Sequence, residues 1–249
     1  MSGRTVLITG ASSGLGEEMA RQFAALGWDL ALCARRAERL EKLRDEIGAA
    51  HPERRVVLKA LDVTDDEAVF RVFAEFAEEF GSIERVIVNA GLGKGAAYGT
   101  GRHDANRQTA MTNFVGALAQ SEAAMEIFRR QRRGHLVMIS SISALRGMRK
   151  AMTTYAATKA GVAAMAEGLR SERVPGLDVS VIYPGYIRSE MNEHVKQKTK
   201  YMVDTETGVR AMVQAIEKRK VKAYVPSWPW VPIAAAMKVL PLSVVRRLV

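Results

Sequence analysis

The segment Thr9-Gly10-Ala11-Ser12-Ser13-Gly14-Leu15-Gly16 decides the fold of this chain. It joins the apolar run Val6–Thr9 to a stretch of helical period, so it is expected to link a strand to a helix. Such a loop presents backbone N–H groups and a helix N-terminus to a phosphate. Its glycines permit a tight turn, a close backbone approach to a pyrophosphate and close packing of the helix. An ordinary glycine-rich turn is the alternative, and the flanking strand and helix favour the phosphate site.

Short apolar runs alternate with longer segments of helical period along most of the chain. The runs are predicted to be strands buried on both faces: Val6–Thr9, Leu30–Ala34, Arg55–Leu61, Val86–Asn89, Leu136–Ser140 and Val179–Tyr183. Helical period recurs around residues 15–27, 40–48, 64–81, 105–130, 155–173 and 205–218. The alternation predicts an α/β domain with a doubly wound parallel sheet of about seven strands and helices on both faces. We assign residues 1–225 to this domain and residues 226–249 to a C-terminal tail.

The composition excludes several other classes of protein. With 249 residues, 48% of them hydrophobic and 26% charged, the chain can bury a sizeable core and is not a disordered protein. The single cysteine, Cys33, excludes an internal disulfide, and four scattered histidines give no metal-binding motif. Residues 1–8 lack the shape of a signal peptide, and no uncharged apolar run reaches the roughly 20 residues of a membrane span. A cytoplasmic protein without a metal site is therefore expected.

The end of the second predicted strand bears on which dinucleotide would bind. A carboxylate there usually holds the free ribose hydroxyls of NAD, whereas an arginine accommodates the 2′-phosphate of NADP. The sequence Leu32-Cys33-Ala34-Arg35-Arg36 offers two guanidinium groups and no carboxylate. Because arginine can bind a phosphate through two parallel hydrogen bonds, Arg35 and Arg36 favour NADP. A pair of solvated arginines at the start of a helix is the alternative.

Tyr155 and Lys159 lie one helical turn apart and share one face of a predicted helix. A phenol has a pKa near 10, and a neighbouring ammonium favours the phenolate, which brings that pKa toward the range of acid–base catalysis. Ser140-Ser141-Ile142-Ser143 follows the predicted strand Leu136–Ser140, at the edge where open α/β sheets bind ligands. A hydroxyl, a phenol and an ammonium are therefore expected in one site.

Taken in order, these motifs resemble those of the classical short-chain dehydrogenase/reductase (SDR) family. The matching residues are Thr9 to Gly16, Asp62-Val63, Asn89-Ala90-Gly91, Asn113, Ser141, Tyr155 with Lys159, and Pro184-Gly185. They cover residues 1 to about 225, in the family's order and approximate spacing. The resemblance implies a single Rossmann-type domain and an oxidoreductase that uses a nicotinamide cofactor.

The resemblance also implies roles for several of the matching residues, and Asn89-Ala90-Gly91 would support the central sheet beside the cofactor. Tyr155 would donate a proton to a carbonyl oxygen, Ser141 would hold that oxygen, and Lys159 would lower the pKa of Tyr155 and bind the nicotinamide ribose. Asn113 would anchor a water that links Lys159 to solvent. Asp62 would contact the adenine, and the segment after the Pro-Gly pair would flank the nicotinamide. The implied cofactor-binding set is Gly10, Ser12, Ser13, Gly14, Leu15, Gly16, Arg35, Arg36, Asp62, Val63, Asn89, Ala90, Gly91, Tyr155, Lys159, Pro184, Gly185, Ile187 and Ser189.

Two positions and one interval depart from the family pattern. Val88 stands where the family often has a first asparagine, and Ser189 replaces a common threonine. The interval from Ser141 to Tyr155 is about one residue longer than the common spacing. Ser143 is therefore a competing candidate for the serine role.

Positive charge is concentrated in residues 127–166 and 207–249 of a chain whose formal net charge is +10. A solvated basic face is one explanation, and an acidic membrane surface or a substrate with a phosphate-bearing handle are others. Nucleic acid is not expected, because no aromatic residues interleave with Arg129–Arg133 and no binding module is present. Lys196, Lys198 and Lys200 follow the Pro-Gly loop, where the family has its substrate lid, and would meet an anionic head group or face solvent.

The tail combines Trp228 and Trp230, nearby prolines and the apolar segment Ile233–Val249. Apolar bulk with tryptophans and a few cations suits a segment that lies in a membrane interface. The alternative is that the tail packs on the protein, where it closes the substrate cleft or fills a subunit interface. Both alternatives supply apolar surface near the expected site, so a hydrophobic substrate is predicted, such as a keto-acyl lipid or a steroid-like carbonyl.

The residues and the resemblance together predict an NADPH-dependent ketoreductase that reduces a hydrophobic ketone or aldehyde through Ser141, Tyr155 and Lys159. The same site would serve an NADP-dependent alcohol dehydrogenase in the oxidative direction, because the catalyst works both ways. A non-catalytic protein that senses NADPH or acts as a scaffold is disfavoured, since a pure binder has no need of Tyr155. A membrane-surface protein whose tail is its main function is a further alternative. The family resemblance also implies a homodimer or homotetramer, paired through helices near 105–130 and 155–173.

Overall fold

One parallel sheet organises the computed structural model, which describes residues 4–192 and 201–248. Its strands lie in the order β3-β2-β1-β4-β5-β6-β7, and every neighbouring pair is parallel. The strands are β1 (Thr5–Thr9), β2 (Asp29–Ala34), β3 (Val56–Ala60), β4 (Arg85–Val88), β5 (Gly134–Ile139), β6 (Leu177–Pro184) and β7 (Lys222–Val225). The predicted seven-stranded, doubly wound α/β fold is confirmed. Only β7 had no predicted counterpart, because its three apolar residues, Ala223-Tyr224-Val225, do not stand out between a lysine-rich segment and Pro226.

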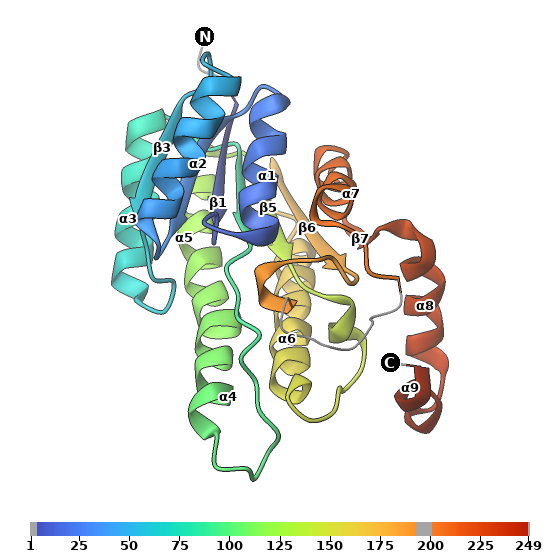
Figure 1. Cartoon of the computed structure of the whole chain (residues 1–249). Helices are drawn as coiled ribbons and strands as arrows, with labels where there is room; N and C mark the ends of the chain where they lie inside the picture. Colours follow the sequence, from blue (N-terminus) through green and yellow to red (C-terminus); the bar gives the residue numbers. More distant parts are fainter. Residues whose placement is uncertain (1–3, 193–200, 249) are drawn as a thin grey trace.

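Helices cover both faces of the sheet, as Figure 1 shows. The first layer comprises α1 (Gly14–Ala25), α2 (Ala37–Ala50) and α7 (Thr205–Glu217), and the second comprises α3 (Asp66–Phe80), α5 (Gly116–Gln131) and α6 (Met152–Ser171). Each layer buries an apolar stripe against the strands, led by Met19 and Phe23 on one face and by Phe73 and Phe76 on the other. The central strands are therefore buried on both faces, in agreement with their continuous apolar runs. For the edge strand β3 the expected burial on both faces is wrong, because its residues are half-buried or exposed.

The helical segment predicted around residues 105–130 is confirmed, and the structure adds a feature that the sequence did not predict. The segment forms α4 (His103–Ala110) and α5, joined through a wider π-helical turn at Met111–Val115. A π-turn accommodates one extra residue within a continuous helix, and it is found often at functional sites. Apolar spacing does not reveal it, because the residues on both sides keep a helical period.

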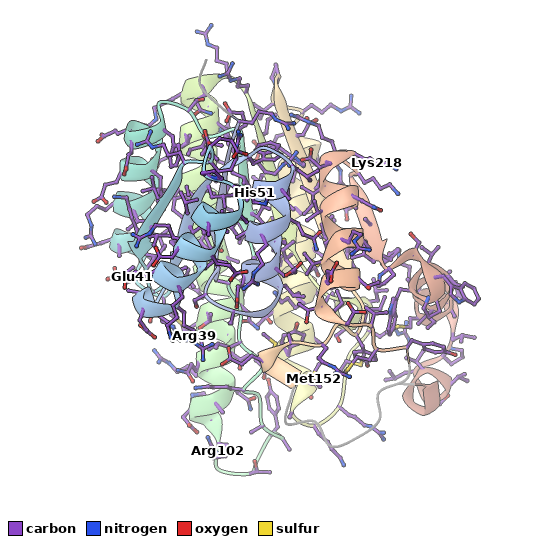
Figure 2. The ribbon with its side chains drawn as sticks, turned by 45° about the horizontal axis from the view of Figure 1, so that its top comes forward. Arg39, Glu41, His51, Arg102, Met152 and Lys218 are labelled. Atoms are coloured by element: carbon purple, nitrogen blue, oxygen red, sulfur yellow. The ribbon has the colours of Figure 1, made fainter. Side chains whose placement is uncertain are left out.

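All strands are parallel, so the chain leaves each of them at the same edge of the sheet. Thr9, Asn89, Ser140 and Pro184 thus end or follow β1, β4, β5 and β6 at this carboxyl edge. In Figure 2, Arg39 and Met152 lie toward this end of the molecule, and His51 and Lys218 lie toward the opposite end. Strand order reverses between β1 and β4, and this is where open α/β sheets bind nucleotides.

The tail forms two helices, α8 (Ser227–Val239) and α9 (Leu242–Leu248), at the β7 side of the molecule (Figure 1). The inner face of α8 buries Trp230, Ala234 and Met237 in a small apolar cluster with Ile142, which follows β5. Trp228 of the same helix is 79% exposed. In the part of the chain that the structure describes, no helix is long and apolar enough to cross a bilayer. The inner face of the tail therefore packs at the carboxyl edge of the sheet, beside the end of β5.

Candidate active site

The glycine-rich loop packs tightly against the end of β4. Gly10 and Gly14 have φ values of +65° and +56°, which side chains rarely adopt. A Cβ on Gly10 would lie 2.9 Å from the Ala90 Cα, and a Cβ on Gly16 would lie 2.3 Å from the Gly10 carbonyl oxygen. No side chain fits at either position. The loop therefore brings bare backbone and the start of α1 to the switch point, as a phosphate site requires.

Thr9, the first residue of the glycine-loop motif, holds the loop against the end of β4. Its Oγ1 accepts hydrogen bonds from the backbone N–H groups of Asn89 at 3.0 Å and Ala90 at 3.1 Å. The Asn89 side-chain amide donates back to the Thr9 carbonyl at 2.9 Å. Asn89 thus supports the strand ends beside the cofactor site through these bonds.

The structure brings Ser141, Tyr155 and Lys159 together between β5 and α6. The Ser141 hydroxyl hydrogen-bonds the Tyr155 phenol, and the Lys159 ammonium lies 5.9 Å from the centre of the Tyr155 ring. Burial raises the pKa of Tyr155, and the bond from Ser141 opposes this rise. Burial also lowers the pKa of Lys159 to about 8. That Lys159 lowers the pKa of Tyr155 stays a prediction.

Backbone contacts hold the lysine in this position. Lys159 Nζ donates to the Ile139 carbonyl at 2.9 Å, and the Ser140 hydroxyl donates to the Lys159 carbonyl at 2.8 Å. Both bonds tie α6 to the end of β5. The helix therefore carries Tyr155 and Lys159 at a fixed position relative to Ser141.

The two candidate serines take different positions. Ser141 precedes a 3₁₀ turn at Ile142–Leu145, and its Oγ accepts a hydrogen bond from the Ser143 backbone N–H at 3.1 Å. Ser143 is buried and lies within this turn, two residues after Ser141. Of the two hydroxyls, that of Ser141 contacts Tyr155.

Asn113 lies in the π-turn, and its side chain hydrogen-bonds the backbone of the segment after β4. Its Oδ1 accepts from the Leu92 N–H at 2.6 Å, and its Nδ2 donates to the Leu92 carbonyl at 2.8 Å. Gly91 lies between Asn113 and Lys159, because a Cβ there would be 3.4 Å from Asn113 Oδ1 and 3.6 Å from Lys159 Nζ. The amide is therefore used to position this segment, and the water relay through Asn113 stays a prediction.

The two arginines after β2 differ in their surroundings. Arg36 Nη2 donates to the Ser13 hydroxyl at 2.6 Å, and its Nε donates to the Ser12 hydroxyl at 3.3 Å. Arg35 is more exposed and lies 3.9 Å from the Asp62 carboxylate. Asp62 in turn accepts from the backbone and hydroxyl of Thr64, beyond the end of β3. Arg36 is thus the guanidinium that reaches the glycine loop.

The remaining predicted residues lie at the same edge of the sheet. A Cβ on Gly14 would be 3.3 Å from the Ser189 Cβ, so the segment after Pro184 faces the glycine loop. Ile187 is buried, and Val63 packs at the start of α5, where a Cβ on Gly116 would lie 2.6 Å from its carbonyl. Lys196, Lys198 and Lys200 lie outside the described residues. The described chain holds no cluster of three or more His, Cys, Asp or Glu residues that suits a metal ion.

Comparisons with known proteins agree with this geometry. The family model described as short chain dehydrogenase matches residues 4–200. The chain is 50% identical over 243 residues to an uncharacterized oxidoreductase of Mycobacterium tuberculosis, covering 97% of this chain and 96% of that protein. It is similar to the bulky-bulky ketone specific alcohol dehydrogenase from Comamonas testosteroni, with TM-score 0.80, 25% identity, and 98% and 97% of the two chains covered. An alcohol dehydrogenase from the archaeon Thermococcus sibiricus, solved with 5-hydroxy-NADP, has TM-score 0.79, 25% identity, and 89% and 95% coverage.

Fold and site together define an oxidoreductase with a Rossmann-type domain, which acts on alcohol or carbonyl groups. The chain belongs to the short-chain dehydrogenase/reductase family.

Proposed function

We propose that this protein is an NADPH-dependent ketoreductase that reduces a hydrophobic ketone or aldehyde. The observation that carries the proposal is the contact of the Ser141 hydroxyl with the Tyr155 phenol, with the Lys159 ammonium held beside them. A protein that only binds a dinucleotide has no use for this arrangement of proton donors.

The chain's own residues supply the proton transfer. Bound NADPH supplies the hydride for the carbonyl carbon. The Ser141 hydroxyl donates a hydrogen bond to the carbonyl oxygen as negative charge develops there. The Tyr155 hydroxyl transfers its proton to the same oxygen, and the Lys159 ammonium stabilises the phenolate that remains. Asn113 would hold the water through which Lys159 and Tyr155 regain their proton from solvent.

The residues present fit a phosphate-bearing dinucleotide. The glycine loop has no room for side chains at Gly10 and Gly16, and Gly91 leaves open the space between Asn113 and Lys159. Arg36 reaches the hydroxyls of Ser12 and Ser13, where a guanidinium and two hydroxyls could bind a 2′-phosphate together. The 5-hydroxy-NADP bound to the Thermococcus sibiricus relative supports NADP as the cofactor.

The variants Arg36→Ala and Arg35→Ala test the choice of NADPH. We expect Arg36→Ala to raise the Kd of NADPH by about 10- to 100-fold, because one charge-assisted contact is worth about 1.5–3 kcal/mol. Arg35→Ala should have the same direction with a smaller effect, since Arg35 is more exposed and pairs with Asp62. The Kd of NADH should change little. Fluorescence titration with both cofactors measures this, and an equal loss for NADH would contradict the assignment.

The tail supplies the argument for a hydrophobic substrate. A Cβ on Gly185 would lie 2.0 Å from Trp230 Nε1, so the indole lies directly on the Pro-Gly loop. Tyr186 meets the Trp230 ring edge to face at 5.1 Å between ring centres, and Ile142 packs in the same cluster one residue after Ser141. We propose that this face of α8 forms one apolar wall of the substrate cleft. The similarity to the bulky-bulky ketone specific alcohol dehydrogenase from Comamonas testosteroni supports this.

The two tail tryptophans form a matched pair for testing this wall. We expect Trp230→Ala to lower kcat/KM for long-chain or polycyclic ketones by about tenfold or more, and to lower the Tm, since emptying such a site costs about 3–5 kcal/mol. Trp228→Ala should change neither value, because Trp228 is 79% exposed. Activity against carbonyl compounds of graded size gives the readout. A uniform loss for small and large ketones would show that Trp230 acts on the fold alone.

The other finer assignments are part of the same proposal. We propose reduction as the physiological direction and, by analogy with the family, a homodimer or homotetramer as the assembly. Contact of the tail with a membrane finds less support than the cleft wall, because Trp230 packs inward.

A further inference from the structure

Glu190 forms an ion pair with Arg36, the arginine that contacts the glycine loop. Its carboxylate accepts two parallel hydrogen bonds from Arg36, from Nη1 to Oε1 at 3.1 Å and from Nη2 to Oε2 at 3.0 Å. Arg39 Nη1 lies 3.2 Å from both of its oxygens, and the Ser13 hydroxyl hydrogen-bonds it as well. Two guanidiniums and a serine hydroxyl around one oxyanion are the donors that a phosphate monoester would use.

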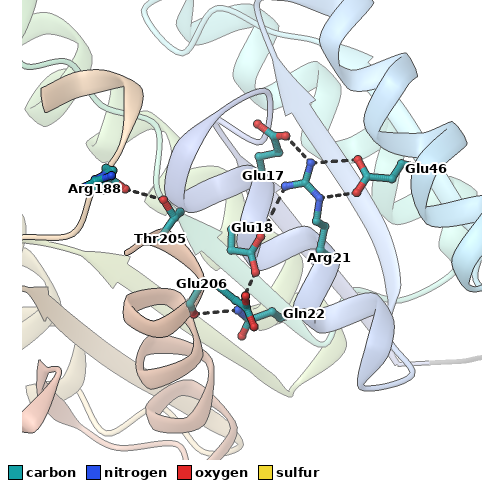
Figure 3. A network of polar contacts seen from close by, with 8 residues as sticks. All are labelled: Glu17, Glu18, Arg21, Gln22, Glu46, Arg188, Thr205 and Glu206. Carbon is teal, nitrogen blue, oxygen red and sulfur yellow. Dashed lines mark hydrogen bonds and ion pairs between the residues drawn. The ribbon is translucent and has the colours of Figure 1, made fainter. Parts of the chain in front are cut away.

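The neighbouring carboxylates are engaged elsewhere. Figure 3 shows Arg21 of α1 bonded to Glu17 and to Glu46 of α2. Glu18 accepts from Gln22, which also donates to the Glu206 carbonyl of α7. These contacts fix α1 against α2 and α7. Glu17, Glu18 and Glu46 thus bond to residues of α1, whereas Glu190, which follows β6, bonds to Arg36.

We propose that Glu190 is a specificity-determining residue that competes with the 2′-phosphate of NADP for Arg36. The inference rests on the proposed use of Arg36 for that phosphate. The carboxylate is an intramolecular substitute for the phosphate, so NADPH binds only at the cost of breaking the pair between Glu190 and Arg36. NADH has no 2′-phosphate and leaves the pair intact. Glu190 therefore weakens NADPH binding selectively and narrows the preference for NADPH over NADH.

The surroundings leave room for the displaced carboxylate. A pocket of about 490 Å³ lies on the α1 side of the pair, and its walls include Glu190, Arg39, Arg188 and Ser13. Glu190 and both of its arginine partners are partly exposed, with 37% to 44% of each side chain accessible. Arg39 faces both the pair and the pocket, so the carboxylate can remain beside a cation when it leaves Arg36. Solvent screening of the exposed pair makes the cost of displacement modest.

The isosteric variant Glu190→Gln tests the competition in the full chain. We expect the Kd of NADPH to fall about three- to tenfold, which corresponds to the loss of a partly exposed ion pair as competitor. The Kd of NADH should stay within about twofold. The effect should shrink at high salt, because screening weakens the pair in the parent protein. Binding is read from quenching of tryptophan fluorescence, without turnover.

Two further variants make the result decisive. Glu38→Gln removes an exposed carboxylate from the first turn of α2, the helix that also carries Arg39. This variant should leave the Kd of NADPH and the Kd of NADH unchanged. Glu190→Ala should tighten NADPH in the same direction as Glu190→Gln. If Arg36→Ala leaves the Kd of NADPH unchanged, the assigned use of Arg36 fails. If Arg36→Ala raises the Kd of NADPH but neither Glu190 variant lowers it, the proposed competition is overturned and the use of Arg36 stands.

Discussion

Tyr155→Phe should retain NADPH binding and lose turnover by about 10³-fold or more. The hydroxyl is the only group that the substitution removes, and general acid catalysis contributes about 10²- to 10⁴-fold. The ring still fills the same space between β5 and α6, so the fold and the cofactor site should not change. Steady-state oxidation of NADPH with a ketone, followed at 340 nm, gives the rate, and fluorescence titration gives the Kd.

Thr154→Ser is a suitable control for this variant. Thr154 precedes Tyr155 on α6 and contacts the Tyr98 hydroxyl at 3.0 Å, and serine keeps that hydroxyl. The control should keep nearly full activity. Near-normal turnover of Tyr155→Phe would remove the phenol as the proton donor and with it the proposed mechanism.

Ser141→Ala should lower kcat by about 10²- to 10³-fold, whereas Ser143→Ala should have a much smaller effect. The larger number is typical for removal of one hydrogen bond to a developing oxyanion. The Ser141 hydroxyl contacts the Tyr155 phenol. Ser143 contacts the Ser141 hydroxyl through the Ser143 backbone N–H. Alanine keeps that N–H, so the turn after β5 should survive in the Ser143 variant.

Measurement of both serine variants with the same ketone separates their roles. The Kd of NADPH should be unchanged in each, because neither hydroxyl contacts the glycine loop or Arg36. A collapse of kcat in Ser143→Ala with normal activity in Ser141→Ala would reverse the assignment. The longer interval from Ser141 to Tyr155 would then reflect a shift of the catalytic hydroxyl along the turn.

The sheet could be predicted from sequence because its strands are short and apolar, and the central ones are buried on both faces. The six predicted strands lie within two residues of their observed ends. The edge strand β7 was not predicted, since three apolar residues between a lysine-rich segment and Pro226 do not stand out as a strand. The order of glycines, serine, tyrosine and lysine was also readable, because each motif is local and its place at a strand end follows from the alternation of strands and helices.

The tertiary contacts of the site could not be predicted from the sequence. Glu190 and Arg36 are 154 residues apart, and nothing in either local sequence marks the other as its partner. The packing of Trp230 on Gly185 is equally invisible, because an apolar tail suits a membrane, a neighbouring subunit or the domain itself. Such choices depend on which surfaces the completed sheet leaves uncovered.

The wide turn at Met111–Val115 changes the rotational phase between α4 and α5, although the two helices follow one another without a break. In an ordinary helix each residue advances by about 100°, so one added residue rotates everything beyond it by that angle. The portion before the turn and the portion after it can therefore each present the side required of it, with Asn113 aimed at the Leu92 backbone in between. Removing a single residue here would put the two halves out of phase: either Asn113 would swing away from Leu92, or the apolar stripe of α5 would rotate off the sheet.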